Sequence, residues 1–290
     1  RAEIAKVDAR IDAMRAKYAA DPEFQKHEAL LDNGIDLARL TYPEVRTLRC
    51  QMQYIFQDPY SSLNPRMTVA NIIGEGLLAH KYCKKANERM HEEILQTMED
   101  CGLAPYFLHR YPHQFSGGQR QRIGIARSLA VHPKFVVCDE AVSALDVSIQ
   151  SQIINLLQDL KEQQHLTYLF ITHDLGVINQ MADNVAVMYC GQVVEYAPAE
   201  TIFHKSVYSH PYTEGLFGSI PDLDSKAKRL KPIPGLMPDP ANLPEGCSFC
   251  PRCPYATEQC KTQNPNITEV EPGHLVRCFH HIGKEETNRG

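Results

Sequence analysis

The sequence predicts an α/β protein built around a largely parallel sheet with helices on both faces. Apolar runs of strand length alternate with longer amphipathic stretches through the first two thirds of the chain, which is the pattern of repeated strand and helix units. Hydrophobic residues make up 43% and charged residues 22% of the 290 residues, as in ordinary folded proteins. No apolar run approaches the roughly 18 residues needed to cross a bilayer. We therefore expect a globular chain of about two domains.

The first expected element is an amphipathic helix that ends before Asp21-Pro22. Apolar residues recur three and four positions apart at Ile4, Val7, Ile11, Met14 and Tyr18. A surface helical hairpin and a partner-binding coiled coil are both consistent with this stripe. Further helices are expected at 43–49, 68–80, 86–101, 117–131, 148–164 and 174–182. Strands are expected between them at 52–56, 135–139, 167–172, 184–190 and 192–196.

Composition divides the chain into three parts. After Pro198 the sequence becomes rich in proline, histidine and glycine, and the stretch 221–245 is typical of a linker or an irregular tail. We expect a helical segment at 1–29 and an α/β region at 30–200 that contains a helical part at 58–114. An irregular extension with a cluster of cysteines is expected at 201–290.

Two adjacent carboxylates stand at the carboxyl end of the strand expected at 135–139. Ligands of open α/β sheets bind at the carboxyl ends of the strands, so Asp139 and Glu140 are candidate site residues. Mg²⁺ takes few carboxylates and keeps several waters, so Asp139 could hold this ion while Glu140 polarises an attacking water. For the segment 135–140 taken alone, the alternative is a hydrophilic strand end without function.

Two neighbouring strands are also followed by residues suited to such a site. His173 comes after the strand expected at 167–172, where it could reach the same phosphate as Glu140. Gln57 comes after the strand expected at 52–56, and its amide could contact metal-bound water and a mobile loop. A histidine taken alone is equally consistent with a structural role.

An anion site is indicated at the start of the helix expected at 117–131. Ser116, Gly117, Gly118 and Gln119 open this helix, so free backbone N–H groups and the positive end of the helix dipole are available to a phosphate. The absence of side chains on the two glycines would let the phosphate approach. An ordinary serine helix cap is the alternative.

In this order and spacing, these segments resemble the ATP-binding subunits of ABC transporters. The matching motifs are the Gln57 loop, the signature at Phe115–Gln119, the Asp139-Glu140 pair, the loop Ser143-Ala144-Leu145-Asp146 and His173. The resemblance implies a P-loop NTPase-like ABC cassette, with 30–200 as the ATPase domain and 58–114 as its helical subdomain.

The resemblance also implies a role for each motif. Glu140 is implied as the general base, His173 as the switch histidine and Gln57 as the nucleotide sensor that couples to the membrane subunit. Asp139 is implied to position Mg²⁺ on ATP. The signature residues Ser116, Gly117, Gly118 and Gln119 would face the γ-phosphate held by a second ABC ATPase subunit, and Asp146 would lie in the loop between subunits.

Two departures from the family pattern stand out. The phosphate-cradling Walker A loop, G-x-x-x-x-G-K-S/T, does not occur in the 290 residues. We interpret the chain as an N-terminally truncated cassette in which 1–29 is an amphipathic helical insertion, and we expect no ATP turnover by these residues alone. Ala141 stands where the family usually has proline, and the alanine is expected to loosen the turn slightly.

The extension at 201–290 is similar to that of the oligopeptide, dipeptide and nickel importer subfamily. The matching segments are Ser209-His210-Pro211-Tyr212-Thr213, Gly246-Cys247 and Arg252-Cys253-Pro254-Tyr255. Ser61-Ser62-Leu63-Asn64-Pro65, directly after the Gln57 loop, agrees with the same subfamily.

Five cysteines in this extension follow the spacing C-x₂-C-x₂-C-x₆-C-x₁₇-C. In the cytoplasmic compartment that the sequence favours, this spacing favours metal thiolates over disulfides. The subfamily pattern selects Cys247, Cys253, Cys260 and Cys278 and implies a 4Fe–4S cluster, with Cys250 as the spare thiol. A zinc site and unmetallated thiols are the alternatives, since iron–sulfur clusters and Zn²⁺ both accept four thiolates.

The function implied by the resemblance is ATP hydrolysis that energises import of dipeptides or oligopeptides. The implied partners are a second ABC ATPase subunit, identical or different, two membrane permease subunits and, indirectly, an extracytoplasmic substrate-binding protein. The chain is thus expected at the cytoplasmic face of the membrane. The net charge of −5 argues against a nucleic-acid partner. A soluble non-transport ABC ATPase and a non-catalytic cassette that completes a partner's ATP site are the alternatives.

Overall fold

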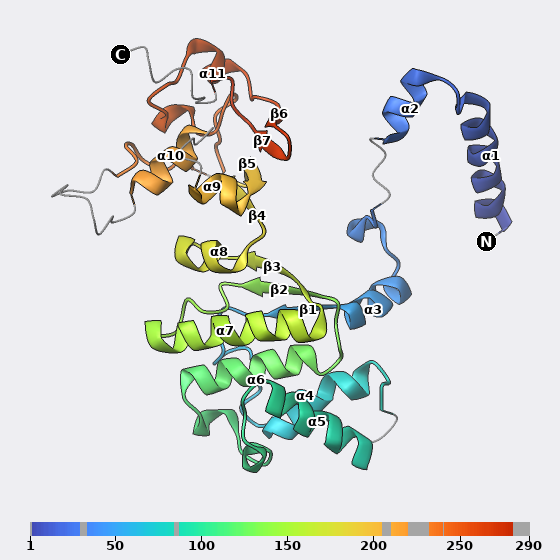
Figure 1. Ribbon diagram of the computed structural model, residues 1–290, viewed down its shortest axis with the longest axis vertical. Helices are drawn as coiled ribbons and strands as arrows, with labels where there is room; N and C mark the ends of the chain where they lie inside the picture. The colour runs from blue at the N-terminus through green and yellow to red at the C-terminus, as the bar shows by residue number, and fades with distance from the viewer. Residues whose placement is uncertain are drawn as a thin grey trace. The chain divides into compact units, whose positions relative to one another are not determined.

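The computed structural model divides the chain into two units, Arg1–Arg49 and Cys50–Gly290, which we describe separately (Figure 1). The described residues are 2–29, 34–83, 87–204, 210–219, 232–239 and 241–280. Part of the proline-rich stretch expected to be a linker, and Ser209 of the His-Pro-Tyr segment, lie outside the described residues. No helix within these ranges is both long and apolar enough to cross a lipid bilayer.

The first unit, Arg1–Arg49, is helical. Helix α1 (Ala2–Tyr18) ends before Asp21-Pro22 as expected, and α2 (Pro22–Ala29) begins directly after Asp21. The carboxylate of Asp21 accepts the amide of Glu23 at 2.9 Å, so Asp21-Pro22 starts a second helix as well as ending the first. A 3₁₀ turn and a helix that continues into the second unit follow, η1 (Leu37–Arg39) and α3 (Tyr42–Gln51).

A three-stranded parallel sheet forms the centre of the second unit. Its strands β1 (Met52–Ile55), β2 (Phe135–Asp139) and β3 (Thr167–Ile171) lie in that order and within the ranges expected from the sequence. Ile55 pairs with Cys138 and Asp139 with Ile171. Because the strands run in the same direction, the residues that follow them meet at one edge of the sheet.

Four helices between these strands confirm the helices expected at their positions. They are α4 (Val69–Ala79), α5 (Glu88–Asp100), α6 (Gly117–Leu129) and α7 (Val147–Gln164), with the 3₁₀ turns η2 (Pro105–Phe107) and η3 (Pro112–Gln114) between α5 and α6. Each helix begins after a side chain that accepts an amide N–H of its first turn, from Thr68, Asn87, Ser116 and Asp146. Helices α6 and α7 lie along one face of the sheet (Figure 1).

The opposite face of the parallel sheet is only partly covered. Exposed and half-buried positions alternate along β3, and Leu169 and Ile171 are 49% and 47% exposed. A parallel sheet normally buries both faces, which is why the sequence predicts helices on both. In the part of the chain that the structure describes, the packing of α6 and α7 accounts for one face only.

The two strands expected after the parallel sheet belong to a second, antiparallel sheet. Strands β4 (Asn184–Tyr189) and β5 (Gln192–Pro198) form a hairpin, because Cys190 and Gly191 at its turn both have positive φ angles, 46° and 78°. Strands β6 (Thr268–Glu271) and β7 (His274–Val276) complete the order β4-β5-β7-β6. The sequence predicts one largely parallel sheet, whereas the structure divides these strands between a parallel and an antiparallel sheet.

The extension after residue 200 is folded where it is described, which corrects the expectation of an irregular tail. Its strands β6 and β7 pair onto the β4–β5 hairpin, so one sheet joins residues on both sides of the expected boundary. A second core of buried side chains includes Val187, Tyr189, Ile202 and Phe249. The helices around this core are α9 (Ala199–His204), α10 (Pro211–Gly218), η4 (Cys250–Arg252) and α11 (Glu258–Thr262).

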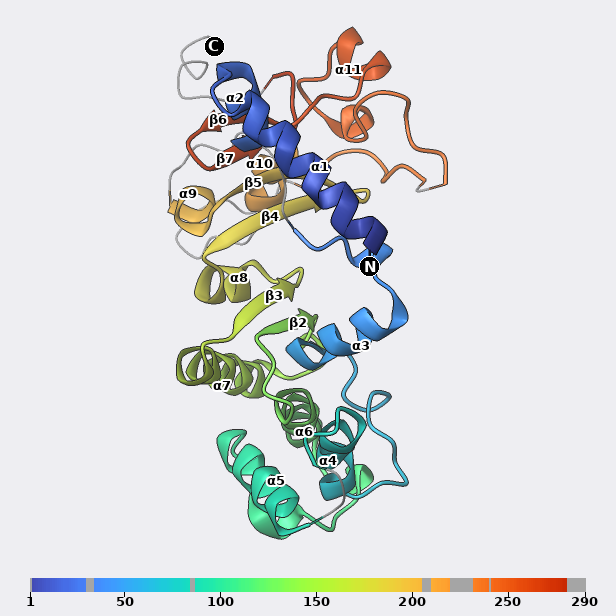
Figure 2. The same cartoon turned by 90° about the vertical axis from the view of Figure 1, so that its right-hand side faces the viewer.

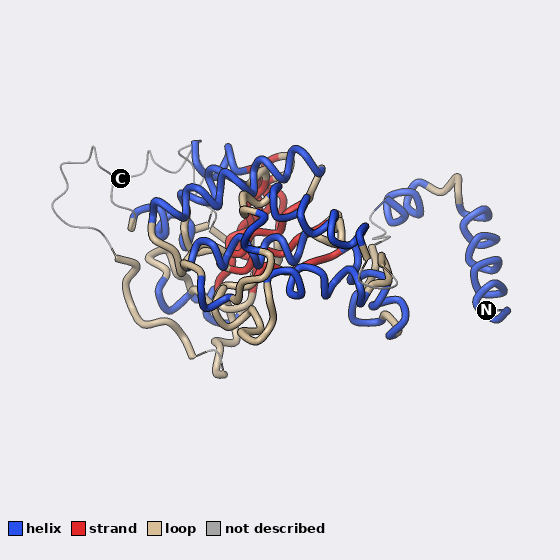
Figure 3. The backbone as a smooth tube through the Cα atoms, turned by 90° about the horizontal axis from the view of Figure 1, so that it is seen from below, coloured by secondary structure: helices blue, strands red, loops and turns tan. Residues whose placement is uncertain are grey.

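Helix α8 (Leu175–Met181) connects the two cores of the Cys50–Gly290 unit. It lies between β3 and β4 in both side views (Figures 1 and 2). Val177 and Met181 pack into the core beneath the parallel sheet, whereas Ile178 packs against the second core. Seen from below, the strands of this unit gather at its middle (Figure 3).

Candidate active site and a cysteine-lined pocket

The residue that follows β2 has an unusual backbone conformation. Glu140 has a φ angle of 44°, in the left-handed region that is rare for a residue with a side chain. Its amide donates to the carbonyl oxygen of Ile171 at 2.8 Å, so the turn is held by the last residue of β3. This conformation ends the strand abruptly and leaves the Glu140 carboxylate at the edge where the three strands end.

Two residues predicted from separate segments meet at that carboxylate. The Gln57 side-chain amide donates to Glu140 Oε2, and His173 Nδ1 lies 3.1 Å from Glu140 Oε1. The His173 side chain is 72% exposed and the Glu140 side chain 27% exposed, so the group is open to a ligand. The hydrogen bond from His173 holds the pKa of Glu140 below its usual value, with a smaller contribution from Gln57. Glu140 is therefore ionised at neutral pH and can accept a proton.

The carboxylate of Asp139 has a partner that we did not expect from the sequence. The hydroxyl group of Tyr54 donates to Asp139 Oδ2. Tyr54 pairs with Val137, two residues before Asp139, so both side chains lie on the same face of the sheet. This hydrogen bond raises the pKa of Tyr54 and keeps the phenol protonated. The alternation of β1 is the sequence signal that could have identified Tyr54.

Asp139 and Glu140 provide a pair of carboxylates that suits Mg²⁺ when a bound nucleotide supplies the remaining ligands. Mg²⁺ is commonly bound by one or two carboxylates together with phosphate oxygens and water. Among the described residues, no three or more histidine, cysteine, aspartate or glutamate side chains, the clustered cysteines of the extension included, are arranged to hold a metal ion.

The predicted anion site lies at the exposed start of α6. Ser116 Oγ accepts the Gln119 amide at 3.4 Å, and Gln119 Oε1 accepts the Ser116 amide at 3.1 Å, so the two side chains form a capping box. Gly117 is exposed, as a phosphate contact requires. Gly118 is buried, and a Cβ atom there would lie 2.4 Å from Ile149 on α7. Gly118 thus permits close packing of two helices.

The loop 143–146 connects the carboxylate turn to α7. Asp146 caps α7 by accepting the Ile149 amide at 3.1 Å, and Ser143 Oγ donates to the Glu140 carbonyl at 3.0 Å. The buried side chain of Gln121 donates to the Ala141 carbonyl at 2.6 Å, which ties the interior of α6 to the turn after Glu140. Gln121 was not identified from the sequence, because its partner is a backbone atom on another segment.

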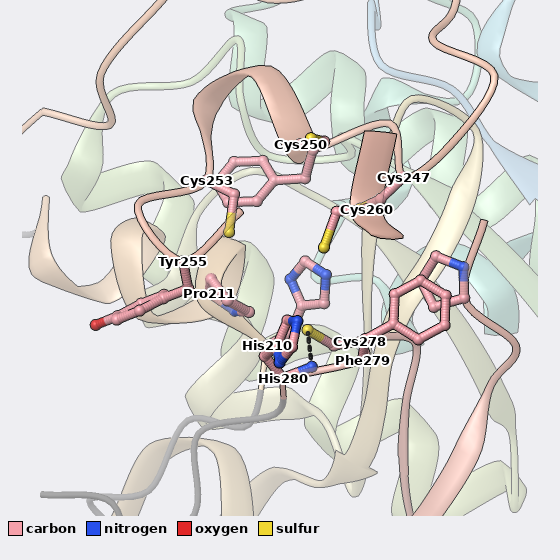
Figure 4. Close-up of a pocket in the computed structure, with 12 residues that line it drawn as sticks. His210, Pro211, Cys247, Cys250, Cys253, Tyr255, Cys260, Cys278, Phe279 and His280 are labelled. Carbon is pink, nitrogen blue, oxygen red and sulfur yellow. Dashed lines mark hydrogen bonds between the residues drawn. The ribbon is translucent and has the colours of Figure 1, made fainter. Parts of the chain in front are cut away.

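All five cysteines of the extension line one pocket (Figure 4). In Figure 4 the side chains of Cys253, Cys260 and Cys278 surround the same space as the imidazoles of His210 and His280. The pocket is closed by aromatic and proline side chains, Pro211, Phe249, Tyr255, Pro265 and Phe279. Burial raises the pKa of Cys253 and of Cys278 to about 11, so both are protonated thiols without a bound cation.

Hydrogen bonds to sulfur distinguish four of these cysteines from the fifth. Cys278 Sγ accepts the His280 amide at 3.3 Å. Amides of the residues that follow Cys247 and Cys253 act to lower the pKa of these two thiols, against the larger effect of burial. Cys260 Sγ lies 3.3 Å from the Thr257 hydroxyl. For Cys250 no such bond is found among the described residues. Amide-to-sulfur bonds of this kind stabilise thiolates in metal sites.

Two family models match the chain. The model described as ABC transporter matches residues 20–143, and the model described as oligopeptide/dipeptide transporter, C-terminal region, matches residues 194–260. The first match includes the Gln57 loop, the signature and the Asp139-Glu140 pair. The second begins within β5 and includes four of the five clustered cysteines.

Curated relatives align over most of the chain. A putative peptide import ATP-binding protein of Brucella ovis is 48% identical over 251 residues, which are 86% of this chain and 78% of the relative. An oligopeptide transport ATP-binding protein of Bacillus subtilis, AppF, is 44% identical over 254 residues, covering 86% of this chain and 76% of that protein.

Solved structures with the same fold cover a smaller part. CbiO1 from Clostridium perfringens, part of an ABC transporter complex, is 26% identical with a TM-score of 0.50, covering 56% of this chain and 63% of its own. A dimeric ATP-binding cassette in a post-hydrolysis state with ADP and Pi is 27% identical with a TM-score of 0.51, covering 58% and 72%.

Proposed function

The chain belongs to the ABC transporter family of ATP-binding proteins, and we propose that it is the ATP-hydrolysing subunit that energises import of dipeptides or oligopeptides. The observation that carries this proposal is the meeting of Gln57, Glu140 and His173 at the ends of parallel strands. The peptide specificity is inferred from the oligopeptide/dipeptide transporter region at 194–260 and from the names of the relatives.

The geometry suits the chain's own residues to hydrolysis of a terminal phosphate. Glu140 is ionised and can orient a water and accept its proton. His173 and Gln57 hold the carboxylate from two sides, so it is oriented before substrate binds. Asp139 would hold Mg²⁺, which neutralises phosphate charge when bound.

The proposed partners follow from the exposed elements around this site. Ser116 and Gly117 lie at the surface, where a second ABC ATPase subunit could present its nucleotide to them. We propose that the helical part at 58–114 docks on two permease subunits at the cytoplasmic face of the membrane. A substrate-binding protein would act outside the membrane and contact the permeases.

Replacement of one atom in the general base tests the function directly. Glu140→Gln on the chromosome should lower uptake of a radiolabelled tripeptide about a hundredfold, because the amide cannot accept the proton of water. The matched control is Glu162→Gln, which changes an exposed carboxylate on α7 and should leave uptake unchanged. Uptake at the wild-type rate with Glu140→Gln contradicts a catalytic role for this chain.

A non-catalytic cassette is the second candidate, because the 290 residues contain no G-x-x-x-x-G-K-S/T loop. Ser116→Arg separates it from the first. If Glu140→Gln retains uptake while Ser116→Arg abolishes it, the chain completes a partner's ATP site without hydrolysing ATP itself. If both variants retain uptake, the chain does not serve a transporter of these peptides. That outcome is the one expected of a soluble non-transport ABC ATPase.

We further propose that four thiols of the pocket hold a metal centre, a 4Fe–4S cluster in preference to Zn²⁺. The hydrogen-bonded sulfur atoms of Cys247, Cys253, Cys260 and Cys278 support this choice of ligands. In the structure these thiols are free and are not arranged around a common ion, so the proposal requires them to draw together when the metal binds. Their chemistry suits either metal. Anaerobic purification followed by iron, sulfide and zinc assays decides, and stoichiometric zinc without iron rejects the cluster. Cys253→Ser should lose the metal, whereas Cys250→Ser should retain it.

A further inference from the structure

One face of α6 is directed at the loop that carries Gln57. Arg120 and Arg127 are seven residues apart, about two helical turns, and so project from the same face of the helix. Both reach the loop 56–62. Arg122 projects from another face and donates to the Cys101 carbonyl at 2.8 Å, in the helical part of the unit.

Arg127 spans the base of this loop. Its Nη1 donates to the Ser62 carbonyl at 2.6 Å, and its guanidinium carbon lies 5.5 Å from the centre of the Phe56 ring. Phe56 directly precedes Gln57, and Ser62 closes the other end of the loop. One planar side chain therefore contacts both ends, which a lysine could not reproduce because it lacks the planar fork.

The remainder of the loop is a compact turn held at its tip by the second arginine. The Tyr60 amide donates to Asp58 Oδ1 at 2.7 Å, and the Ser62 amide donates to the Asp58 carbonyl at 3.2 Å. The guanidinium of Arg120 lies 4.8 Å from the centre of the Tyr60 ring, while its Nε donates to the Pro112 carbonyl at 2.8 Å. The loop is thus held to α6 at two points.

We propose that Arg127 is a positioning residue that clips the Gln57 loop to α6. The loop that reaches Glu140 and the helix that begins with the Ser116 anion site then move as one body. Placement of a phosphate at the start of α6 would in this way set the position of the Gln57 amide beside the general base. The catalytic meaning of this link rests on the proposed function, whereas the clip itself rests on the contacts of Arg127.

Amide hydrogen exchange of the full chain tests the clip without any activity measurement. In Arg127→Lys, exchange of the Tyr60 and Ser62 amides should become about tenfold faster, because a charged hydrogen bond across the loop base is lost. Exchange in the centre of α6 and in β2 should stay at the wild-type rate. The matched control is Arg122→Lys, which should speed exchange of the Gly102 and Leu103 amides and leave the loop unchanged.

Each outcome of this experiment decides for or against the clip. Unchanged exchange at Tyr60 and Ser62 in Arg127→Lys overturns it, and so does acceleration spread equally over α6 and β2. Should Arg127→Lys fail to fold, Phe56→Ala removes the stacking contact from the loop side and is expected to give the same local acceleration. If instead the proposed function is wrong, uptake will be unaltered in Glu140→Gln. That outcome does not affect the hydrogen-exchange result.

Discussion

Two regions of the Cys50–Gly290 unit place reactive side chains in different ways. At the ends of β1, β2 and β3, the exposed side chains of Gln57 and His173 each contact the carboxylate of Glu140. Beside the second sheet, the cysteines line a pocket enclosed by rings and prolines. The first group depends on strand direction alone, whereas the second depends on pairing between segments that are far apart in the sequence. We therefore expect changes in the first region to alter activity and changes in the second to alter stability.

The largest expected effect is on the activity of the strand-end group. His173→Ala should lower the rate of ATP-driven peptide uptake about a hundredfold, because the carboxylate of Glu140 loses a hydrogen bond that holds it. Its free energy of unfolding should change by less than about 0.5 kcal/mol, since the imidazole is 72% exposed. The control is His132→Ala, because His132 is an exposed histidine paired with Glu93 at 3.4 Å. A large loss of stability in His173→Ala would remove the contrast between the regions.

Gly246 gives the converse effect in the pocket region. A Cβ atom there would lie 2.2 Å from the Cys260 carbonyl oxygen, and backbone atoms cannot move aside easily. Gly246→Ala should lower the free energy of unfolding by about 3 kcal/mol and reduce metal retention. Urea unfolding measures the first and a metal assay the second. Gly218→Ala, with no atom near its added Cβ, should remain within about 0.5 kcal/mol of wild type.

Acid should weaken the pocket region in a defined pH range. Burial lowers the pKa of His210 from 6.5 to about 4, so the unfolded chain binds a proton that the folded chain does not. Stability is therefore retained above pH 6.5 and lost as the pH falls toward 4. Between pH 7 and pH 5 we expect a loss of about 2 kcal/mol in metal-free protein, measured by urea unfolding. An equal loss in His210→Gln would assign this pH dependence to other groups.

The two signature glycines should give the smallest difference. Gly118→Ala places a Cβ atom 2.4 Å from Ile149 and should cost about 1–2 kcal/mol, because the helices α6 and α7 must separate slightly. Gly117→Ala meets only Leu145 at 3.6 Å and should be neutral in stability. Thermal unfolding compares the two. If the two variants lose the same amount of stability, close packing of the helices does not by itself explain either glycine.

Local pattern was sufficient for the strand-end region. The helix expected at 68–80 is α4 at Val69–Ala79, and the strand expected at 135–139 is β2 with the same bounds. Period and end signals such as Thr68 determine these elements within a short stretch of chain. Asp139, Glu140 and His173 could be found because each lies at or just after the carboxyl end of an apolar strand.

Contacts between distant segments account for what was missed. Strand β6 has the sequence Thr-Glu-Val-Glu, and its two charged residues do not predict a strand. It forms a strand because it pairs with β7. Tyr54 and Gln121 act through partners 85 and 20 residues away, which no local pattern reveals. The separate antiparallel sheet was not expected, because it depends on the pairing of β5 with β7, which come from distant parts of the chain.

Among the described strands, β3 is one of the two edges of the parallel sheet, and it carries the half-exposed side chains of Leu169 and Ile171. An apolar edge strand is a template for pairing with another polypeptide, and natural proteins usually block such edges with charge or proline. Preparations of these 290 residues should therefore self-associate as concentration rises, and Leu169→Lys should keep them monodisperse.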